Sequence, residues 1–462
     1  KWRKKMKILV LHGSPKGEDS VTMQYSKFLM KKFPEHQWAV ENIGLMINAI
    51  EKDAARFDAV IDSVRGADFI IWSFPVYVLL VPYQVKRFVE LVSERNCIDA
   101  FKGKYAAAIM TSIHYQDHIA KNYIHAVSED MGMNYCSSFT PEMNDLMKDN
   151  IRKGLVSFAK NIFSDCGLKN PVSRAFNTLK ENSFLYNSIG AQNAVIDSCA
   201  RVRIIYDSTG NSSAKEAALQ IAARFNNAVA GDLAEVNIKG GCLGCLRCGL
   251  KSECVYDGTD DYRAFHQKMI MDADIVFFVG EIRDRYFSSK FKLFFDRSFY
   301  RNHMPSLSGK QTGWVVFGEL SSIPNIRQFI EAYSEVSQAN IAGIVSSESN
   351  DQQAFSKDID LLTERAAFFH KEKFIAPDTF LGNGGRRIFR DEIWSFMRVI
   401  FSADYKFYKK NKKFDFPTRK LVNRTVIPLL AWLMRIPALR NGMNKNLKKG
   451  MIAGHSKIVN EA

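Results

Sequence analysis

Four of the eight cysteines fall within thirteen residues of one another, at Cys242, Cys245, Cys248 and Cys254. Cysteines two residues apart on a glycine-containing loop can turn their thiolates toward one metal centre, and a fourth cysteine a few residues on completes the ligand set. This C-x2-C-x2-C-x5-C spacing favours an iron–sulfur cluster over zinc, whose sites usually split into two separated pairs. A loop of reduced thiols without metal is the third alternative. The other cysteines are scattered, which argues against a disulfide-rich secreted protein.

A second candidate site lies in the segment GSPKGEDSVT, between Gly13 and Thr22. Small and hydroxyl-bearing residues, including Ser14 and Ser20, allow backbone N–H groups to close around a phosphate, while Lys16 adds positive charge. The segment therefore predicts a phosphate-binding loop, with an ordinary helix cap as the alternative.

Two more loops are expected beside the first. Pro75-Val76-Tyr77 follows the strand-like segment ADFIIWS, and Thr111-Ser112-Ile113-His114 follows a third strand-like segment. In an open α/β sheet, ligands bind beyond the carboxyl ends of the strands, so all three loops should face one crevice. His114 is interpreted as a partly exposed loop histidine, and the sequence names no catalytic residue.

The elements that carry these loops alternate between strand and helix. Strands are predicted at 7–12, 67–73 and 105–110, and helices at 22–33 and 84–92. This order predicts an α/β fold with a doubly wound parallel sheet covered on both faces.

The same plan occurs twice. ADFIIW at Ala67 matches ADIVFF at Ala273, Lys86 matches Lys292, and Gly103 matches Gly309, each 206 residues later. The first strand and its loop recur at an offset of 194, as Ser14 and Ser208, so 206 − 194 = 12 residues are inserted in the second copy, in the interval that contains the clustered cysteines. We therefore predict two tandem domains, at 1–165 and 200–376, joined by a connecting segment at 166–199 and followed by an extension at 377–462.

The motifs of the first copy resemble those of the NADPH-dependent FMN reductase family of flavodoxin-like proteins. GSPKGEDSVT, the PVY segment followed by PYQVKRF, and the Thr-Ser loop carry the resemblance. It implies two flavodoxin-like domains and an oxidoreductase that takes electrons from NAD(P)H and reduces a flavin, quinone, nitro compound or enone. The FMN phosphate would then bind Ser14, Lys16, Ser20 and Thr22, and the flavin ring would lie against Pro75, Val76, Tyr77, Thr111 and Ser112. Val21 stands where the family usually has asparagine.

The second copy shows a mixed pattern. Its first loop resembles a flavodoxin phosphate loop, which would place a phosphate at Ser208, Thr209, Gly210, Asn211 and Ser212. Glu281-Ile282-Arg283 replaces Pro75-Val76-Tyr77, so two charges lie where a flavin ring would rest. The cysteine spacing resembles that of iron–sulfur flavoproteins, a branch of the same family, which implies a [4Fe–4S] cluster beside the flavin.

Most of the net charge of +15 lies at the C-terminal end, where residues 381–462 contain 18 Lys and Arg against 5 Asp and Glu, or 18 − 5 = +13. Aromatic residues recur there at roughly helical spacing, which predicts a mainly helical extension packed on the protein rather than a nucleic-acid-binding surface. The apolar segment 426–438 with its basic flanks fits core or dimer packing, and it also fits contact with a membrane surface.

The chain contains no run of about 18 apolar residues, and its first residues lack the core of a signal peptide, so a cytoplasmic protein is expected. A homo-oligomer, or a tandem pair that mimics one, is also expected. The alternative function is a non-catalytic carrier, in which flavin and cluster relay electrons between proteins and the basic extension docks an acidic redox partner.

Overall fold

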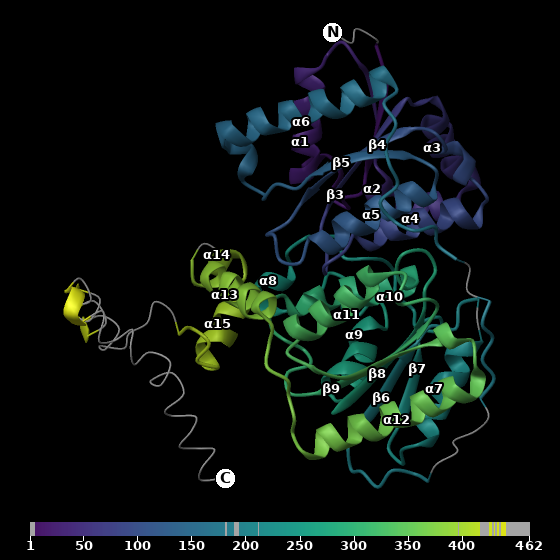
Figure 1. Cartoon of the computed structure of the whole chain (residues 1–462), viewed down its shortest axis with the longest axis vertical. Coiled ribbons are helices and arrows are strands. Elements are labelled where there is room, and N and C mark those ends of the chain that lie inside the picture. The colour runs from purple at the N-terminus through teal and green to yellow at the C-terminus, as the bar shows by residue number, and fades with distance from the viewer. Residues whose placement is uncertain are drawn as a thin grey trace.

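The computed structural model describes residues 5–180, 183–188, 194–210, 212–395 and 397–415, together with positions 425–426, 429, 432–433 and 436–439. It contains two five-stranded parallel sheets, one in each half of the chain, with helices on both faces (Figure 1). The predicted fold class is therefore confirmed. The last described helices form a separate layer beside the junction of the two units (Figure 1).

The first unit has the strand order β2-β1-β3-β4-β5. Its strands are β1 (Lys7–His12), β2 (Gln37–Glu41), β3 (Phe69–Pro75), β4 (Tyr105–Thr111) and β5 (Asn134–Phe139). Its helices are α1 (Val21–Lys32), α2 (Ile43–Lys52), α3 (Ala54–Gly66), α4 (Tyr83–Glu94), α5 (His118–Asp130) and α6 (Asp149–Leu168), with the short turns η1 (Gly17–Asp19), η2 (Ile98–Ala100) and η3 (Asp145–Met147). The central strands are buried on both faces, which explains their continuous apolar runs.

The second unit has the strand order β7-β6-β8-β9-β10. Counted along the chain within each unit, both sheets therefore place the second strand at one edge, followed by the first, third, fourth and fifth. Its strands are β6 (Val202–Tyr206), β7 (Val229–Asp232), β8 (Ile275–Glu281), β9 (Gln311–Phe317) and β10 (Asn340–Ser346). Its helices are α7 (Ser213–Ala223), α8 (Cys248–Lys251), α9 (Tyr262–His266), α10 (Ser289–Arg297), α11 (Pro324–Val336) and α12 (Gln352–Lys371), with the short turns η4 (Gln267–Met271), η5 (Ser298–Arg301) and η6 (Ser347–Ser349).

The duplication extends to the register of the strands. Phe69 of β3 pairs with Tyr105 of β4, and Ile275 of β8 pairs with Gln311 of β9, so both partners lie 36 residues apart. α5 and α11 have the same length and begin 206 residues apart, at His118 and Pro324. The two units are therefore copies of one backbone plan, as the repeated motifs predict.

The two units pack through equivalent helices. α4 contacts α10, α5 contacts α11, and the Asn325 side chain donates to the backbone carbonyl of Ile119 at 3.0 Å. One cluster of buried apolar side chains runs through both units, from Leu9 and Phe88 to Phe295 and Tyr333. Burying apolar area stabilises by about 25 cal/mol per Å2, so this shared core couples the two sheets. The tandem chain thus resembles a dimer within one molecule.

The C-terminal extension contains α13 (Phe380–Trp394), α14 (Met397–Ile400) and α15 (Ser402–Lys410), which confirms its helical character. α15 packs against α8, and Gly249 of α8 approaches the Ile400 carbonyl so closely that an added Cβ would lie 2.2 Å from the oxygen. Phe389 contacts Tyr115 of the first unit edge to face, with ring centroids 5.6 Å apart. The helical part of the extension, from α13 to α15, is therefore packed on both units.

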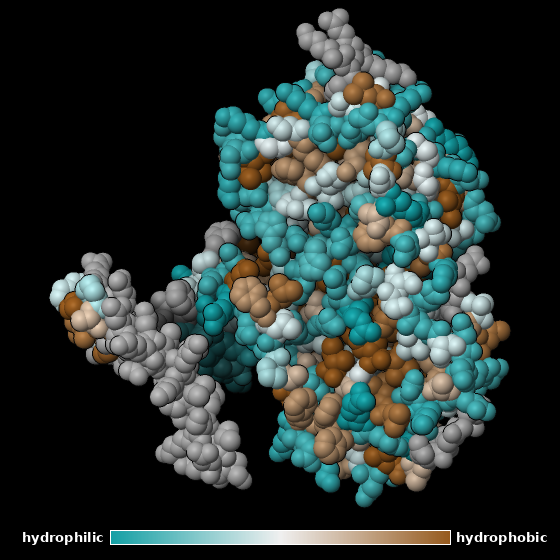
Figure 2. All heavy atoms as spheres, viewed as in Figure 1, coloured by the Kyte–Doolittle hydropathy of each residue, from teal (hydrophilic) through white to brown (hydrophobic). Residues whose placement is uncertain are grey.

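Apolar side chains remain at the surface of the extension, including Phe380, which is 88% exposed, and Val399, which is 67% exposed. Over the visible face, hydrophilic residues predominate, and hydrophobic ones gather in patches on the second unit (Figure 2). Among the described residues, no helix combines the length and apolarity that crossing a bilayer requires. Positions 427–428, 430–431 and 434–435 of the predicted membrane or packing segment 426–438 lie outside the described residues, so the role of this segment stays a prediction.

Candidate functional site

The three loops predicted to form one crevice do meet at one edge of the first sheet. β1, β3 and β4 are neighbours, so the loops that follow them leave from adjacent strand ends. The backbone N–H of Val76 donates to the carbonyl of Thr111 at 2.9 Å, and the hydroxyls of Thr22 and Thr111 are 2.6 Å apart. Residues from all three loops are thus joined by hydrogen bonds.

The first loop is a compact turn whose hydroxyl groups point inward. Ser14, Ser20 and Thr22 are buried, whereas Lys16 is exposed beside them. The backbone N–H of Lys16 donates to the Ser14 hydroxyl at 3.3 Å, and the N–H of Gly17 donates to the Ser14 carbonyl at 3.2 Å. Ser20 stands at the start of α1 without capping it through its side chain. The hydroxyls and the free helix start are the groups that bind phosphate oxygens in such loops.

Helix α2 packs closely against the backbone of the first loop. A Cβ added at Gly44 would lie 2.3 Å from the carbonyl carbon of Gly13 and 2.6 Å from that of Ser14. Real side chains do not approach backbone atoms this closely, so only glycine fits at this position. Gly44 was not singled out from the sequence, because nothing in its own neighbourhood shows which loop the helix will contact.

The second loop carries Tyr77 on a strained turn. Val78 and Leu79 have φ values of 39° and 69°, a region that bulky side chains rarely adopt. Tyr77 and Leu80 exchange backbone hydrogen bonds of 2.9 and 3.1 Å, which close the turn. Burial holds the pKa of the Tyr77 hydroxyl well above its usual value, and the nearby Cys242 adds to this effect. Tyr77 is therefore neutral at physiological pH.

The third loop turns away from the sheet after Thr111. The Ser112 hydroxyl donates to the Asp117 carboxylate at 2.8 Å, and the exposed His114 ring lies 2.9 Å from the same carboxylate. The side chain of Ser112 is thus engaged within its own loop. Tyr115, which the sequence did not single out, is the residue that the extension covers through Phe389.

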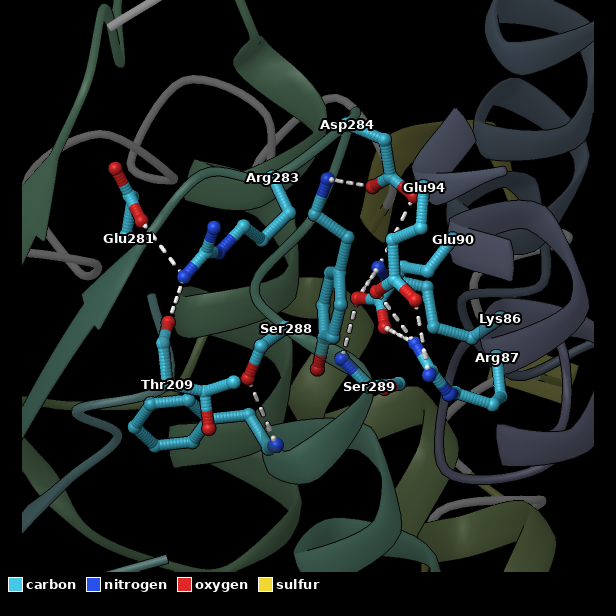
Figure 3. Close-up of polar contacts among 12 residues, drawn as sticks. Lys86, Arg87, Glu90, Glu94, Thr209, Glu281, Arg283, Asp284, Ser288 and Ser289 are labelled. Atoms are coloured by element: carbon cyan, nitrogen blue, oxygen red, sulfur yellow. Dashed lines mark hydrogen bonds and ion pairs between the residues drawn. The ribbon is translucent and has the colours of Figure 1, made fainter. Parts of the chain in front are cut away.

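The equivalent first loop of the second unit differs in its charges. The Ser208 hydroxyl and backbone N–H both donate to the carboxylate of Asp232, and those of Thr209 donate to Asp207 at 2.6 and 3.0 Å. The Arg283 side chain donates to the Thr209 carbonyl (Figure 3). A Cβ at Gly210 would lie 3.0 Å from the same guanidinium.

Two carboxylates of the chain itself therefore take the donors that a phosphate would need, and their negative charge opposes an anion. Ser212 lies at the start of α7 without a side-chain cap bond, and Asn211 lies outside the described residues. Binding of a phosphate at Ser208, Thr209, Gly210, Asn211 and Ser212 stays a prediction, and the described contacts of this loop weigh against it.

Comparisons with known proteins agree with this geometry. Residues 6–157 match the model of a protein family described by its flavodoxin-like fold. The first unit is flavodoxin-like. No curated protein matches the chain.

Similar solved structures cover about a third of the chain each. They include an apo NADH:FMN oxidoreductase named EMOB, with 18% identity, a TM-score of 0.30 and coverage of 37% of this chain and 92% of its own. The general stress protein 14 of Treponema denticola, in complex with FMN, has 14% identity, a TM-score of 0.28 and coverage of 35% and 99%. The flavoenzyme FerB of Paracoccus denitrificans has 18% identity, a TM-score of 0.28 and coverage of 34% and 98%.

The cysteine loop of the second unit reaches the crevice of the flavodoxin-like first unit. A Cβ added at Gly244 would lie 2.2 Å from the Tyr77 hydroxyl oxygen and 2.9 Å from Cε of Lys16. The Gln84 side chain donates to the backbone carbonyl of Cys242 at 3.3 Å. The glycine between two predicted metal ligands thus touches two residues predicted to bind FMN. The sequence placed both loops but gave no reason for them to meet.

The four clustered cysteines line a single cavity, together with Leu243, Gly244, Leu246, Val255, Tyr256, Arg297, Phe299 and Tyr300. All four are free thiols in the structure. Burial raises the pKa values of Cys242 and Cys248 to about 12, so without a metal both thiols stay protonated at neutral pH. Among the described residues, no three His, Cys, Asp or Glu side chains are arranged to hold a metal ion. The cavity nevertheless gathers a four-cysteine donor set.

Proposed function

We propose that the protein is an FMN-dependent NAD(P)H oxidoreductase whose flavin binds in the crevice of the first unit. The flavodoxin-like match over residues 6–157 and the convergence of three loops at one sheet edge support this proposal. In a flavodoxin-like sheet this edge is the ligand-binding position. The observation that carries the proposal is the first loop, where buried hydroxyls and a helix start lie beside Lys16, and where no carboxylate among the described residues is bonded to those hydroxyls.

The residues of the crevice form two groups, one for the phosphate and one for the ring of FMN. Ser14, Ser20 and Thr22 provide hydroxyls, and Lys16 provides the charge that balances a phosphate. Pro75, Val76 and Tyr77 with Thr111 and Ser112 would border the flavin ring. The Thr22–Thr111 bond fixes the distance between the two groups.

FMN, when bound, accepts a hydride from a nicotinamide and passes electrons on, which is chemistry of the cofactor rather than of a protein acid or base. The chain therefore has to bind and orient the cofactor and exclude water. The contact of Gly244 with Tyr77 covers one side of the crevice. No described side chain needs to be assigned a proton-transfer step.

We also propose that the cysteine loop holds a [4Fe–4S] cluster that exchanges electrons with this flavin. Cys242, Cys245, Cys248 and Cys254 line one cavity, although the sulfurs are not grouped as ligands of a single ion. A four-iron cluster binds each thiolate through a different iron and so holds the four sulfurs farther apart than one zinc ion does. The contact between Gly244 and Tyr77 would make the route between the two cofactors short.

The acceptor of an oxidoreductase would be a small molecule such as a flavin, quinone, nitro compound or enone. A non-catalytic electron carrier is the second candidate, because Cys245 is exposed and a protein partner can approach it. Adding NAD(P)H to the anaerobic purified protein distinguishes the two. Bleaching of the flavin absorption band supports the oxidoreductase, and an unchanged band supports the carrier.

The cofactor sites are tested by flavin, iron and zinc counts on anaerobically prepared protein. Lys16→Glu should abolish FMN binding because it places a carboxylate beside the phosphate, whereas Lys215→Glu in α7 of the second unit should not. Flavin that stays stoichiometric in the Lys16 variant would contradict the proposed site. Cys245→Ser should remove iron and brown absorbance, and zinc in the wild-type protein would contradict the cluster.

A further inference from the structure

A buried ion pair of the second unit contacts the backbone of the strained loop of the first unit. Lys292 and Asp296 lie one turn apart on α10, and both are fully buried. The Lys292 ammonium donates to the Tyr77 carbonyl at 2.7 Å and also pairs with Asp296. The Asp296 carboxylate accepts from the backbone N–H of Tyr83 at 2.7 Å. One ion pair therefore binds both ends of the segment 77–83.

The backbone of this segment is strained at two consecutive residues. Val78 and Leu79 lie between the two anchored ends and have positive φ values. Bulky residues in that region cost about 1–3 kcal/mol each and persist only where surrounding contacts impose the conformation. The anchors at Tyr77 and Tyr83 are such contacts, and they come from the other unit.

The reciprocal contact shows that the arrangement follows the pseudo-twofold relation between the units. Lys86 and Glu90 of α4 stand at the positions equivalent to Lys292 and Asp296. Glu90 accepts from the backbone N–H of Ser289 at 2.6 Å, as Asp296 does from Tyr83. Lys86 binds Glu90 at 2.6 Å and Asp284 at 3.0 Å (Figure 3).

The two pairs differ in what their anchored loops contain. Arg283, the counterpart of Tyr77, points to Thr209 and fills the loop region of its own unit (Figure 3). Its loop has no positive φ at the positions equivalent to Val78 and Leu79. The Lys86–Glu90 pair therefore supports a loop without positive φ values, and the Lys292–Asp296 pair supports a strained loop.

We propose that Lys292 and Asp296 of the second unit are positioning residues for the flavin-binding loop of the first unit, so that the second unit completes the FMN site of the first. This inference rests on the proposed function. The pair does not touch the reacting atoms. It holds Tyr77 and its neighbours in the bound arrangement before FMN arrives, which lowers the ordering cost of binding.

The test replaces each buried pair by apolar residues of similar size, because removing one charge alone would leave its partner unpaired in the core. The double variant Lys292→Met with Asp296→Leu is compared with a control variant that combines Lys86→Met, Glu90→Leu and Asp284→Asn, because Lys86 also binds the Asp284 carboxylate. We measure FMN dissociation constants by fluorescence. In the apoproteins we measure hydrogen exchange of the backbone N–H groups within residues 78–83, where Pro82 has none, and within residues 284–289.

We expect the Lys292/Asp296 variant to bind FMN roughly tenfold more weakly and to exchange the amides of 78–83 faster, while the control stays within about twofold of the wild type. Faster exchange at 284–289 alone is expected of the control. Equal FMN affinity in both variants, or unchanged exchange at 78–83, would overturn the inference. If the wild-type protein binds no FMN, the proposed function fails instead, and the exchange measurement still tests the anchoring of the loop.

Asp296→Asn provides a second variant should the double replacement not fold. Its amide oxygen can still accept from the Tyr83 N–H, but Lys292 loses its counter-charge. FMN binding should then weaken by a few-fold relative to Glu90→Gln. No difference between these two variants would also overturn the inference.

Discussion

The two units share one backbone plan and differ in how the first loop is filled. In the first unit, Ser14 and Thr22 bond to backbone and hydroxyl groups, and Lys16 is exposed on the same loop. In the second unit, Ser208 and Thr209 donate to the carboxylates of Asp232 and Asp207. The strand order alone therefore does not make a phosphate site. The charges at the strand ends decide whether an anion can enter.

The insertion in the second unit shows a complementary change. That unit contains the cysteine loop, which packs on the crevice of the first unit through Gly244. Charged side chains occupy the first loop region of the second unit, whereas the cysteine loop of the second unit borders the crevice of the first unit. The duplicated domains have thus divided their roles, in the sense that one supplies the proposed flavin crevice and the other supplies its cover and its anchors.

The largest difference between the two units is expected when a side chain is added next to the backbone of the first loop. Gly44→Val places side-chain atoms where the backbone of Gly13 and Ser14 lies, so the loop must move. We expect the free energy of unfolding to fall by about 3 kcal/mol and FMN binding to be lost. Denaturant unfolding and flavin titration measure both effects.

Gly210→Ala in the second unit is the control for this change, since its Cβ meets only the flexible end of Arg283, although φ is +73°. It should cost about 1 kcal/mol and leave FMN binding intact. If the two variants behave alike, the first loop is not constrained as the structure indicates.

An acid-dependent difference is expected at the end of the first strand. Burial lowers the pKa of His12 to about 4, whereas its counterpart in the second unit is Tyr206, which does not titrate in this range. The folded His12 stays neutral while the unfolded chain takes up a proton near pH 6.5, so stability is lost as the pH falls from about 6.5 to 4. The loss reaches about 3 kcal/mol at pH 4.

His12→Asn should remove this contribution, so its stability should fall less steeply between pH 6.5 and 4 than that of the wild type. Urea unfolding at several pH values measures the slope. Parallel slopes for the two proteins would mean that His12 is not buried in its neutral form.

A smaller effect is expected from the hydroxyl that joins two loops. Thr22→Val leaves the buried Thr111 hydroxyl without this partner, which should cost about 1–2 kcal/mol of stability and weaken FMN binding several-fold. Thr209→Val removes an exposed hydroxyl that bonds Asp207 and should leave FMN binding unchanged. Weaker binding in the Thr209 variant would place flavin in the second unit and end the contrast between the two loops.

Local sequence was sufficient for the elements and for the repeat. Alternating apolar runs gave the strands at 7–12 and 105–110 within a residue of β1 and β4, because strands buried on both faces need continuous apolar side chains. Lys86 and Lys292 are separated by the same 206 residues as the other repeated motifs, and this common offset revealed the duplication. The three loops of the first crevice followed from the rule that ligand loops extend from strand ends.

Contacts between distant segments were not predictable in the same way. Gly44 beneath the first loop, Gly244 against Tyr77, and the Asp232 carboxylate that takes the Ser208 donors all depend on residues that lie at least 24 positions apart. A side chain's own neighbours in sequence carry no information about such partners. The first loop of the second unit is an example. Its motif favours phosphate binding, but its Ser208 and Thr209 donors are already bonded to carboxylates of the chain.

By itself, the sequence determined a duplicated α/β chain with a hydroxyl-rich first loop and a four-cysteine cluster, because apolar periodicity and residue spacing act over short distances along the chain. Only the tertiary structure decided that α10 anchors the loop of Tyr77 and that the cysteine loop covers the first crevice. These contacts arise when two equivalent helices bury a common apolar face, which brings together segments more than 150 residues apart.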